Sequence, residues 1–133
     1  MSGISPKLPL YIDPVDGIAL NKTLKQMTRQ NLKMIILTSP GERIMHPKFG
    51  VGLRRYLFMN NTQRTLSDIS RRISRQVKTY LPSVNIISIK FFSENGDEIR
   101  SSFESSSSSN YVHLSLSYTI PAAFASDTLD IKV

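Results

Sequence analysis

The sequence predicts an α+β fold in which two main helices and a short helix pack on a small antiparallel sheet. Two segments repeat apolar residues at the helical period, a stretch rich in glycine and proline separates them, and the C-terminal part alternates apolar with polar residues. The length of 133 residues is that of one domain. We expect an extended N-terminal arm over residues 1–14, the domain over 15–121 and a C-terminal assembly strand over 122–133.

The N-terminal arm is defined by Pro6, Pro9 and Pro14, which forbid a helix and favour extended chain. Its apolar residues are unusual for a disordered tail. They leave two interpretations open: the arm packs on its own domain, or it lies on a neighbouring subunit.

The first long helix is expected to begin between Ile18 and Asn21 and to end near Leu37. Apolar side chains from Leu20 to Ile35 recur at the 3.6-residue period and define one face. Asn21 is the predicted N-cap, because its side chain can accept a hydrogen bond from a free backbone N–H.

Residues 38–58 connect the two long helices and hold three of the six glycines and two of the seven prolines. Glycine and proline at this density specify one backbone path. Because apolar residues, Ile44 and Met45 among them, run through the stretch, we predict a packed elbow that ends in a short helix over Leu53–Phe58. Its structural residues are expected to be Pro40, Gly41, Glu42, Arg43, Pro47, Phe49, Gly50, Gly52 and Leu53.

Within the elbow we interpret Glu42 and Arg43 as a rigidifying network. The carboxylate can accept exposed backbone N–H groups, and the guanidinium can pair with a carboxylate or with backbone carbonyls. Glu42 is also the only acidic residue expected in a structured, apolar setting. Hydrolysis of a glycosidic bond needs two carboxylates facing each other, so no enzymatic activity is expected.

The second long helix is expected to have Thr62 or Thr65 as its N-cap, with Thr65 and Asp68 approximating a capping box. It should end before Pro82, because the residue before a proline is pushed out of α space. Basic residues follow a face of their own beside the apolar stripe. That face is either solvated or a docking face for an acidic partner, and its residues are Arg71, Arg75 and Lys78.

A strand is predicted over residues 84–92, where branched and aromatic residues dominate. Ile87, Ile89 and Phe91 are expected to share one face, and Asn85 and Ile86 indicate an irregular start. Residues 101–110 contain seven serines and no aliphatic residue, so they are expected to form a loop.

The strand predicted over residues 111–120 alternates most regularly, as expected when an antiparallel strand buries one face. Beyond a spacer, Leu129, Ile131 and Val133 alternate with charged residues and indicate another strand. It must add to a sheet edge of its own chain or of a neighbour. We predict an inter-subunit strand, because edge pairing is a common route to assembly.

Composition excludes several classes of function. The absence of cysteine rules out disulfide frameworks, Cys-based metal sites and Cys nucleophiles. His46 and His113 lack the spacing of metal ligands, so no metal and no cofactor are expected. No apolar run is long enough to span a membrane. The net charge of +7 is compatible with a soluble basic surface, an acidic partner or nucleic acid.

The elbow resembles the signature of the phage baseplate protein W family. The pattern is T-x-P-G-E-R, then P-x-F-G, then G-L and L-F, and the resemblance extends from about Leu24 to Ile120. The family includes a baseplate wedge subunit of contractile phage tails and the E component of type VI secretion baseplates. The matching residues are Thr38, Pro40, Gly41, Glu42, Arg43, Pro47, Phe49, Gly50, Gly52, Leu53, Leu57 and Phe58.

The resemblance implies a structural, non-enzymatic part of a contractile-tail baseplate that joins the wedge to the tail sheath and initiates sheath assembly. Implied partners are other baseplate wedge proteins, the tail sheath protein, and tail tube or hub proteins. The implied location is the tail baseplate of the virion, with assembly in the host cytoplasm. The alternatives are a small basic nucleic-acid-binding module and a baseplate-associated lysozyme. Against the first, the basic residues are not interleaved with exposed aromatics, and no groove-reading motif is present.

Family members carry a Glu-Pro-Arg triplet that docks onto the wedge where the second long helix ends. Here the triplet is replaced by Leu81-Pro82-Ser83. If this surface docks, the resemblance implies apolar packing around Leu81 and Pro82, or contacts through the basic face of the helix.

Overall fold

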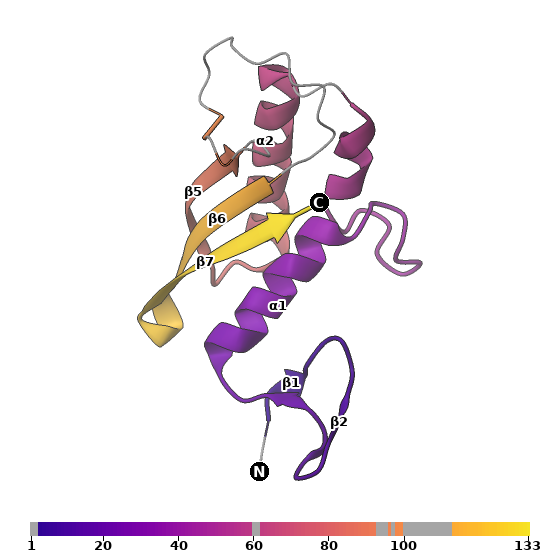
Figure 1. Ribbon diagram of the computed structural model, residues 1–133, viewed down its shortest axis with the longest axis vertical. Coiled ribbons are helices and arrows are strands. Elements are labelled where there is room, and N and C mark those ends of the chain that lie inside the picture. Colours follow the sequence, from indigo (N-terminus) through magenta and orange to yellow (C-terminus); the bar gives the residue numbers. More distant parts are fainter. Residues whose placement is uncertain (1–2, 60–61, 93–95, 97, 100–112) are drawn as a thin grey trace.

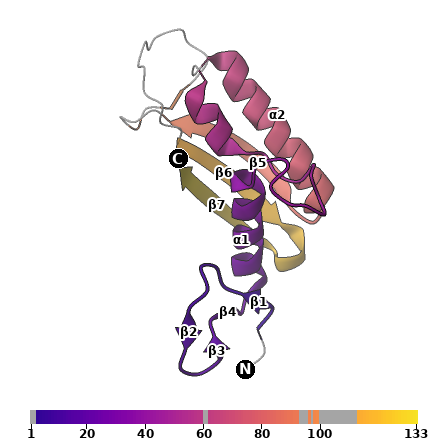
Figure 2. The ribbon, with the colours of Figure 1, turned by 90° about the vertical axis from the view of Figure 1, so that its right-hand side faces the viewer.

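Two helices and a three-stranded antiparallel sheet form the body of the protein. Helices α1 (Leu24–Leu37) and α2 (Gln63–Tyr80) cover the same face of the sheet (Figures 1 and 2). A short 3-10 helix, η1 (Leu53–Phe58), leads from the elbow toward α2. The predicted α+β class is therefore confirmed. The computed structural model describes residues 3–59, 62–92, 96, 98–99 and 113–133.

The sheet has the strand order β5-β6-β7, with strands Asn85–Phe92, His113–Ile120 and Ala125–Lys132. Strand β6 lies in the centre and pairs antiparallel with both neighbours. The serine loop predicted over residues 101–110 lies outside the described residues. A 3-10 turn, η2 (Pro121–Ala123), connects β6 to β7.

The N-cap of α1 is Thr23, whose side chain accepts the backbone N–H of Gln26 at 3.2 Å. The predicted cap, Asn21, is wrong. Its side chain is buried and donates instead to the Ser5 hydroxyl and to the Gln30 side-chain carbonyl, at 3.1 and 3.0 Å. An amide group can satisfy more partners in that interior position than at a solvent-exposed helix end.

Helix α2 is capped by Thr62, whose hydroxyl accepts the Thr65 backbone N–H at 3.3 Å. The predicted capping box of Thr65 and Asp68 does not form, because α2 already begins at Gln63 and the Thr65 backbone N–H donates to Thr62, while Asp68 accepts the Tyr56 hydroxyl at 2.9 Å. The helix ends at Tyr80, two residues before Pro82.

Strand β5 has an irregularity that shifts its side chains. The pairing register slips between Ile86 and Ser88, so Ile87 is the extra residue of a bulge and is 62% exposed. The predicted irregular start of the strand is confirmed by this bulge, but the prediction that Ile87 shares a face with Ile89 and Phe91 is wrong. Ile86 takes that place opposite Tyr118, while Ile89 and Phe91 face inward as predicted.

The hydrophobic core lies between the helices and the inward face of the sheet. The predicted alternation of β6 is confirmed from residue 113 onward, because every second side chain is fully buried. Each such aliphatic side chain stabilises the fold by about 1.5–3 kcal/mol. No helix in the described part of the chain is both long and apolar enough to cross a membrane. The central core residues are Leu32, Ile35, Ile36, Leu66, Ile69, Ile73, Val77, Leu114, Leu116, Tyr118 and Ile120.

The N-terminal residues fold back on themselves beyond the N-terminal end of α1 (Figure 1). Strand β1 (Ser5–Pro6) pairs with β4 (Leu20–Asn21), and β2 (Ile12–Asp13) pairs with β3 (Gly17–Ile18). We call residues 4–21 the N-terminal hairpin. The predicted arm is thus extended but pairs across residue 14 with the residues that follow.

Hydrogen bonds of the elbow backbone fix the elbow to both helices. The Val51 N–H donates to the Ile35 carbonyl of α1 at 2.9 Å. From α2, the Gln76 side chain accepts the Gly50 N–H at 2.9 Å and donates to the Lys48 carbonyl at 3.0 Å. Gln76 therefore clamps the elbow where the chain reverses.

Gly50 lies against the C-cap residue of α1, Thr38. Its φ of 104° is left-handed, and a Cβ there would lie 2.1 Å from the Thr38 carbonyl oxygen. Gly41 also has a left-handed φ of 90°, but a Cβ there would meet nothing within 4 Å. The left-handed backbone favours glycine at both positions. Only at Gly50 would a Cβ also collide with a neighbouring atom.

This difference predicts unequal costs for two matched substitutions. Gly41→Ala should lower the free energy of unfolding by about 1 kcal/mol, the cost of a left-handed φ in a residue with a Cβ. Gly50→Ala should lower it by about 3 kcal/mol or more, because the backbone must also move. Urea unfolding of the two variants provides the measurement. Equal costs would contradict the assignment of Gly50 as the packed point of the elbow.

Candidate functional site

The C-terminal strand predicted to pair with a neighbouring subunit is β7. That prediction is wrong, because β7 pairs with a strand of its own chain. It pairs along its whole length with β6, from Ala125 opposite Ile120 to Lys132 opposite His113. The expected spacer is short, because η2 and Phe124, with a φ of 46°, turn the chain directly back.

The apolar residues of β7 belong to the core of their own chain. Leu129 and Ile131 are 3% and 4% exposed, and Val133 packs against the same core. The alternation of these residues therefore results from burial beneath the helices of their own chain and does not indicate an interface with another subunit. Sequence periodicity could not separate these cases, because a strand that buries one face looks the same in both.

The outer edge of β7 is nevertheless open. The strand is the last one in the sheet order, and no other described strand pairs with its far side. Its outward side chains are exposed and include both signs of charge, at Asp130 and Lys132. An edge strand presents unpaired backbone N–H and C=O groups that can accept a further strand.

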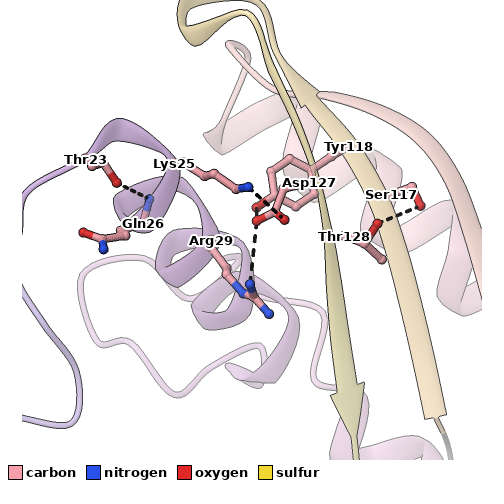
Figure 3. A network of polar contacts seen from close by, with 8 residues as sticks. All are labelled: Thr23, Lys25, Gln26, Arg29, Ser117, Tyr118, Asp127 and Thr128. Carbon is pink, nitrogen blue, oxygen red and sulfur yellow. Dashed lines mark hydrogen bonds and ion pairs between the residues drawn. The ribbon is translucent and has the colours of Figure 1, made fainter.

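A polar network fastens β7 to α1 at Asp127 (Figure 3). Lys25 and Arg29, one helical turn apart, place their side-chain nitrogens 3.4 and 3.7 Å from the Asp127 carboxylate oxygens. The Tyr118 hydroxyl of β6 donates to the same carboxylate at 3.2 Å. One carboxylate thus connects α1, β6 and β7.

The charges in this network shift the pKa values of two groups. Burial, the Asp127 charge and its hydrogen bond together raise the pKa of Tyr118 to about 12, so the hydroxyl remains a donor. Burial acts to raise the pKa of Asp127, but the Thr128 backbone amide and Lys25 outweigh it and leave this pKa below its usual value. Asp127 is therefore a stable anion at neutral pH.

The elbow residues hold their own turn and leave its tip exposed. The Glu42 carboxylate accepts the Ser39 backbone N–H at 2.9 Å. Among the described residues, Arg43 does not pair with a carboxylate or carbonyl as expected; its guanidinium lies 4.0 Å from the centre of the Phe49 ring. Phe49 in turn packs edge-on against Tyr80, with ring centres 4.8 Å apart.

Part of the predicted elbow packing is wrong. Ile44 and Met45 are 94% and 85% exposed, and Glu42 is exposed as well. The packed part begins only at Phe49 and continues through Val51 and Leu53. Gly41 and Pro47 close the tip through a 2.8 Å backbone bond, Pro40 is half-buried, and Gly52 in a left-handed conformation begins η1.

The basic face of α2 is where the sequence predicts it. Arg71, Arg75 and Lys78 are exposed along the helix. At its end Leu81 packs against the core, whereas Pro82 is exposed. The surface that replaces the Glu-Pro-Arg triplet therefore offers one apolar side chain, and the three cations lie further back along the same helix.

The N-terminal hairpin is held by a polar clamp that sequence reasoning missed. The Gln30 side chain of α1 accepts the Leu8 N–H at 2.9 Å and donates to the Pro6 carbonyl at 3.0 Å. The hairpin leaves most of its apolar side chains exposed, including Ile12 at 86% and Val15 at 81%.

The Asp127 network predicts a pH-dependent contribution to stability. Because folding lowers the pKa of Asp127, its contribution is present above the unfolded pKa and is lost as the pH falls through the folded pKa. Asp127→Asn should cost about 1 kcal/mol at pH 7, since Lys25 and Arg29 are half exposed. The difference from the unsubstituted protein should shrink near about pH 2.5.

Urea unfolding at both pH values provides the measurement, and Asp130→Asn is the matched control. Asp130 lies on the same strand but is exposed, so its loss should change stability by less than about 0.5 kcal/mol. An equal effect of both variants would show that Asp127 does not fasten β7.

Comparison with solved structures identifies similar folds. A crystal structure from Geobacter sulfurreducens, of a protein provisionally named a tail lysozyme, aligns with a TM-score of 0.66 and 16% identity. The alignment covers 86% of this chain and 94% of the other chain. The cryo-EM structure of the anti-feeding prophage baseplate aligns with a TM-score of 0.65 and 21% identity, covering 85% of this chain and 81% of that chain.

A comparison with curated proteins finds no match. A comparison with protein families matches residues 22–123 to the family described as baseplate wedge protein gp25. The match spans α1, the elbow, α2 and the sheet as far as η2. The chain therefore belongs to the baseplate wedge protein gp25 family.

Proposed function

We propose that this chain joins the wedge of a contractile-tail baseplate to the tail sheath and starts sheath assembly through the outer edge of β7. Family membership makes the chain a structural baseplate component, located in the tail of a virion beside other baseplate proteins. The proposal adds which surface contacts the sheath and how.

The observation that carries the proposal is an open strand edge held in a fixed position. Leu129 and Ile131 bury their side chains in the core, and Asp127 is fastened to α1 by two cations. The edge is therefore formed before any partner arrives, and no ordering of β7 has to accompany binding. A strand of the sheath protein can add to it through main-chain hydrogen bonds.

Other surfaces are assigned to the wedge. The exposed basic face of α2 and the apolar end at Leu81 would contact wedge proteins, because they lie away from the β7 edge. The N-terminal hairpin offers exposed apolar side chains to a neighbouring subunit. Separate surfaces allow the chain to be held in the baseplate while β7 remains accessible.

We further propose that the chain is not an enzyme and that it assembles in the host cytoplasm. Glu42 is exposed, and its carboxylate is engaged with the Ser39 backbone of its own turn. This contact supports a structural role for Glu42. The neighbour provisionally named a tail lysozyme shares only 16% identity with this chain. That similarity supports a common fold, and a common fold does not imply a common activity.

Deletion of β7 cannot test the proposal cleanly. Removing residues 128–133 would remove two buried side chains, which together stabilise the fold by about 3–6 kcal/mol. That loss is a large part of the 5–15 kcal/mol typical of a whole domain. The domain itself should then unfold, and a failure to assemble sheath would say nothing about the edge.

Site-specific cross-linking gives a direct test and leaves the core intact. A photo-cross-linking residue at Thr128, exposed on β7, should capture the tail sheath protein when particles assemble. The same residue at Asn85, exposed on β5 at the opposite edge, serves as the matched control and should not. Mass spectrometry of the adducts identifies the partner. Sheath adducts from Asn85 and none from Thr128 would contradict the assignment.

A further inference from the structure

A cavity of about 330 Å³ opens between η1 and the beginning of α2. Arg55, Tyr56 and Met59 line it from η1 and the residue after it, and α2 contributes Arg64, Asp68 and Arg72. It lies at the opposite end of α2 from Leu81 and Pro82, and it is separate from the β7 edge.

The cavity carries an excess of positive charge. Three guanidinium groups line it against one carboxylate, and the described residues contain no ion pair that joins Arg55, Arg64 or Arg72 to an acidic side chain. Asp68 instead accepts the Tyr56 hydroxyl at 2.9 Å. The guanidinium groups thus keep planar donor sets that suit a carboxylate.

Tyr56 and Asp68 form a wall of the cavity whose side chains are held in place by a hydrogen bond. Tyr56 is buried and belongs to the core, and its hydroxyl holds an Asp68 oxygen. Burial and this hydrogen bond raise the pKa of Tyr56, so the hydroxyl stays a donor at neutral pH. A wall fixed in this way lets a ligand be bound without reordering the backbone.

Apolar side chains flank the charged cavity. Met59 is 55% exposed on its lining, and Phe58, the preceding residue, is 90% exposed. An exposed aromatic residue next in sequence to the lining, together with arginines that pair with no acidic side chain in the described part of the chain, is a combination enriched where proteins bind each other. The surface therefore suits a ligand that has both negative charge and an apolar group.

We propose that this cavity binds an acidic segment of a partner protein, with an Asp or Glu carboxylate among Arg55, Arg64 and Arg72 and an apolar side chain against Phe58 and Met59. Charge complementarity selects this occupant. Three arginines against one carboxylate leave the lining with a net positive charge that one or two carboxylates of a protein segment can balance. The proposal rests on the proposed function only in taking the partner to be a baseplate protein.

Binding can be measured on the isolated protein, independently of sheath assembly. The probe is a fluorescein-labelled peptide of alternating Glu and Phe, followed by fluorescence anisotropy at physiological salt. The unsubstituted protein should bind it, and the peptide with Gln in place of Glu should bind at least about ten-fold more weakly, because it lacks the carboxylates. No binding of the acidic peptide would overturn the proposal.

Two double variants with the same loss of charge locate the site. Arg55→Gln with Arg72→Gln should weaken peptide binding by about ten-fold or more, because both side chains line the cavity. Lys33→Gln with Lys48→Gln removes two exposed cations outside the cavity and should change binding by less than about two-fold. Equal weakening by both variants would show general charge attraction and overturn the proposal.

A single variant guards against loss of folding, since Arg72 is partly buried. Arg64 is exposed in the first turn of α2, and Arg64→Gln alone should weaken binding by about three-fold while the urea midpoint stays unchanged. An unlabelled DNA duplex is the competitor. Displacement of the peptide by duplex at equal charge concentration would assign the cavity to nucleic acid and overturn the proposal.

Discussion

The antiparallel pairing of β6 with β7 is the constraint on which the rest of the structure depends. It runs the full length of both strands and brings the C-terminal residues under α1. Leu129 and Ile131 then close one side of the core, and Asp127 meets Lys25 and Arg29 of the helix. Without this pairing, the buried face of α1 would lack part of its cover and the sheet would lose the edge assigned to the sheath.

The elbow imposes the second constraint, because it sets how α1 and α2 lie on the sheet. Gly50 lets the backbone pass beside Thr38, and Gln76 secures that passage from α2. Phe49 joins the elbow to Tyr80 at the far end of α2. The helices are thus held together at a tight turn, while Ile44 and Met45 at the loop tip remain exposed.

Periodicity predicts most of the fold and little of the site. The α+β class, both helices and the alternation of β6 follow from the spacing of apolar residues, because burial enforces that spacing. The bulge at Ile87 and the role of Asn21 do not, since each depends on a partner distant in sequence. For the same reason, the sequence does not distinguish Asp127 from an ordinary loop residue, because its partners Lys25 and Arg29 are distant along the chain. Alternation at Leu129 reveals burial but not which chain supplies the cover.

Amide hydrogen exchange, resolved by residue, tests the central claim that β7 is a preformed strand with one open edge. In the isolated protein, alternate amides from Ser126 to Lys132 should be protected by bonds to β6, and the amides between them should exchange fast. Adding the tail sheath protein should protect this second set. Fast exchange of the whole strand in the isolated protein, or an unprotected second set in the complex, would contradict the account.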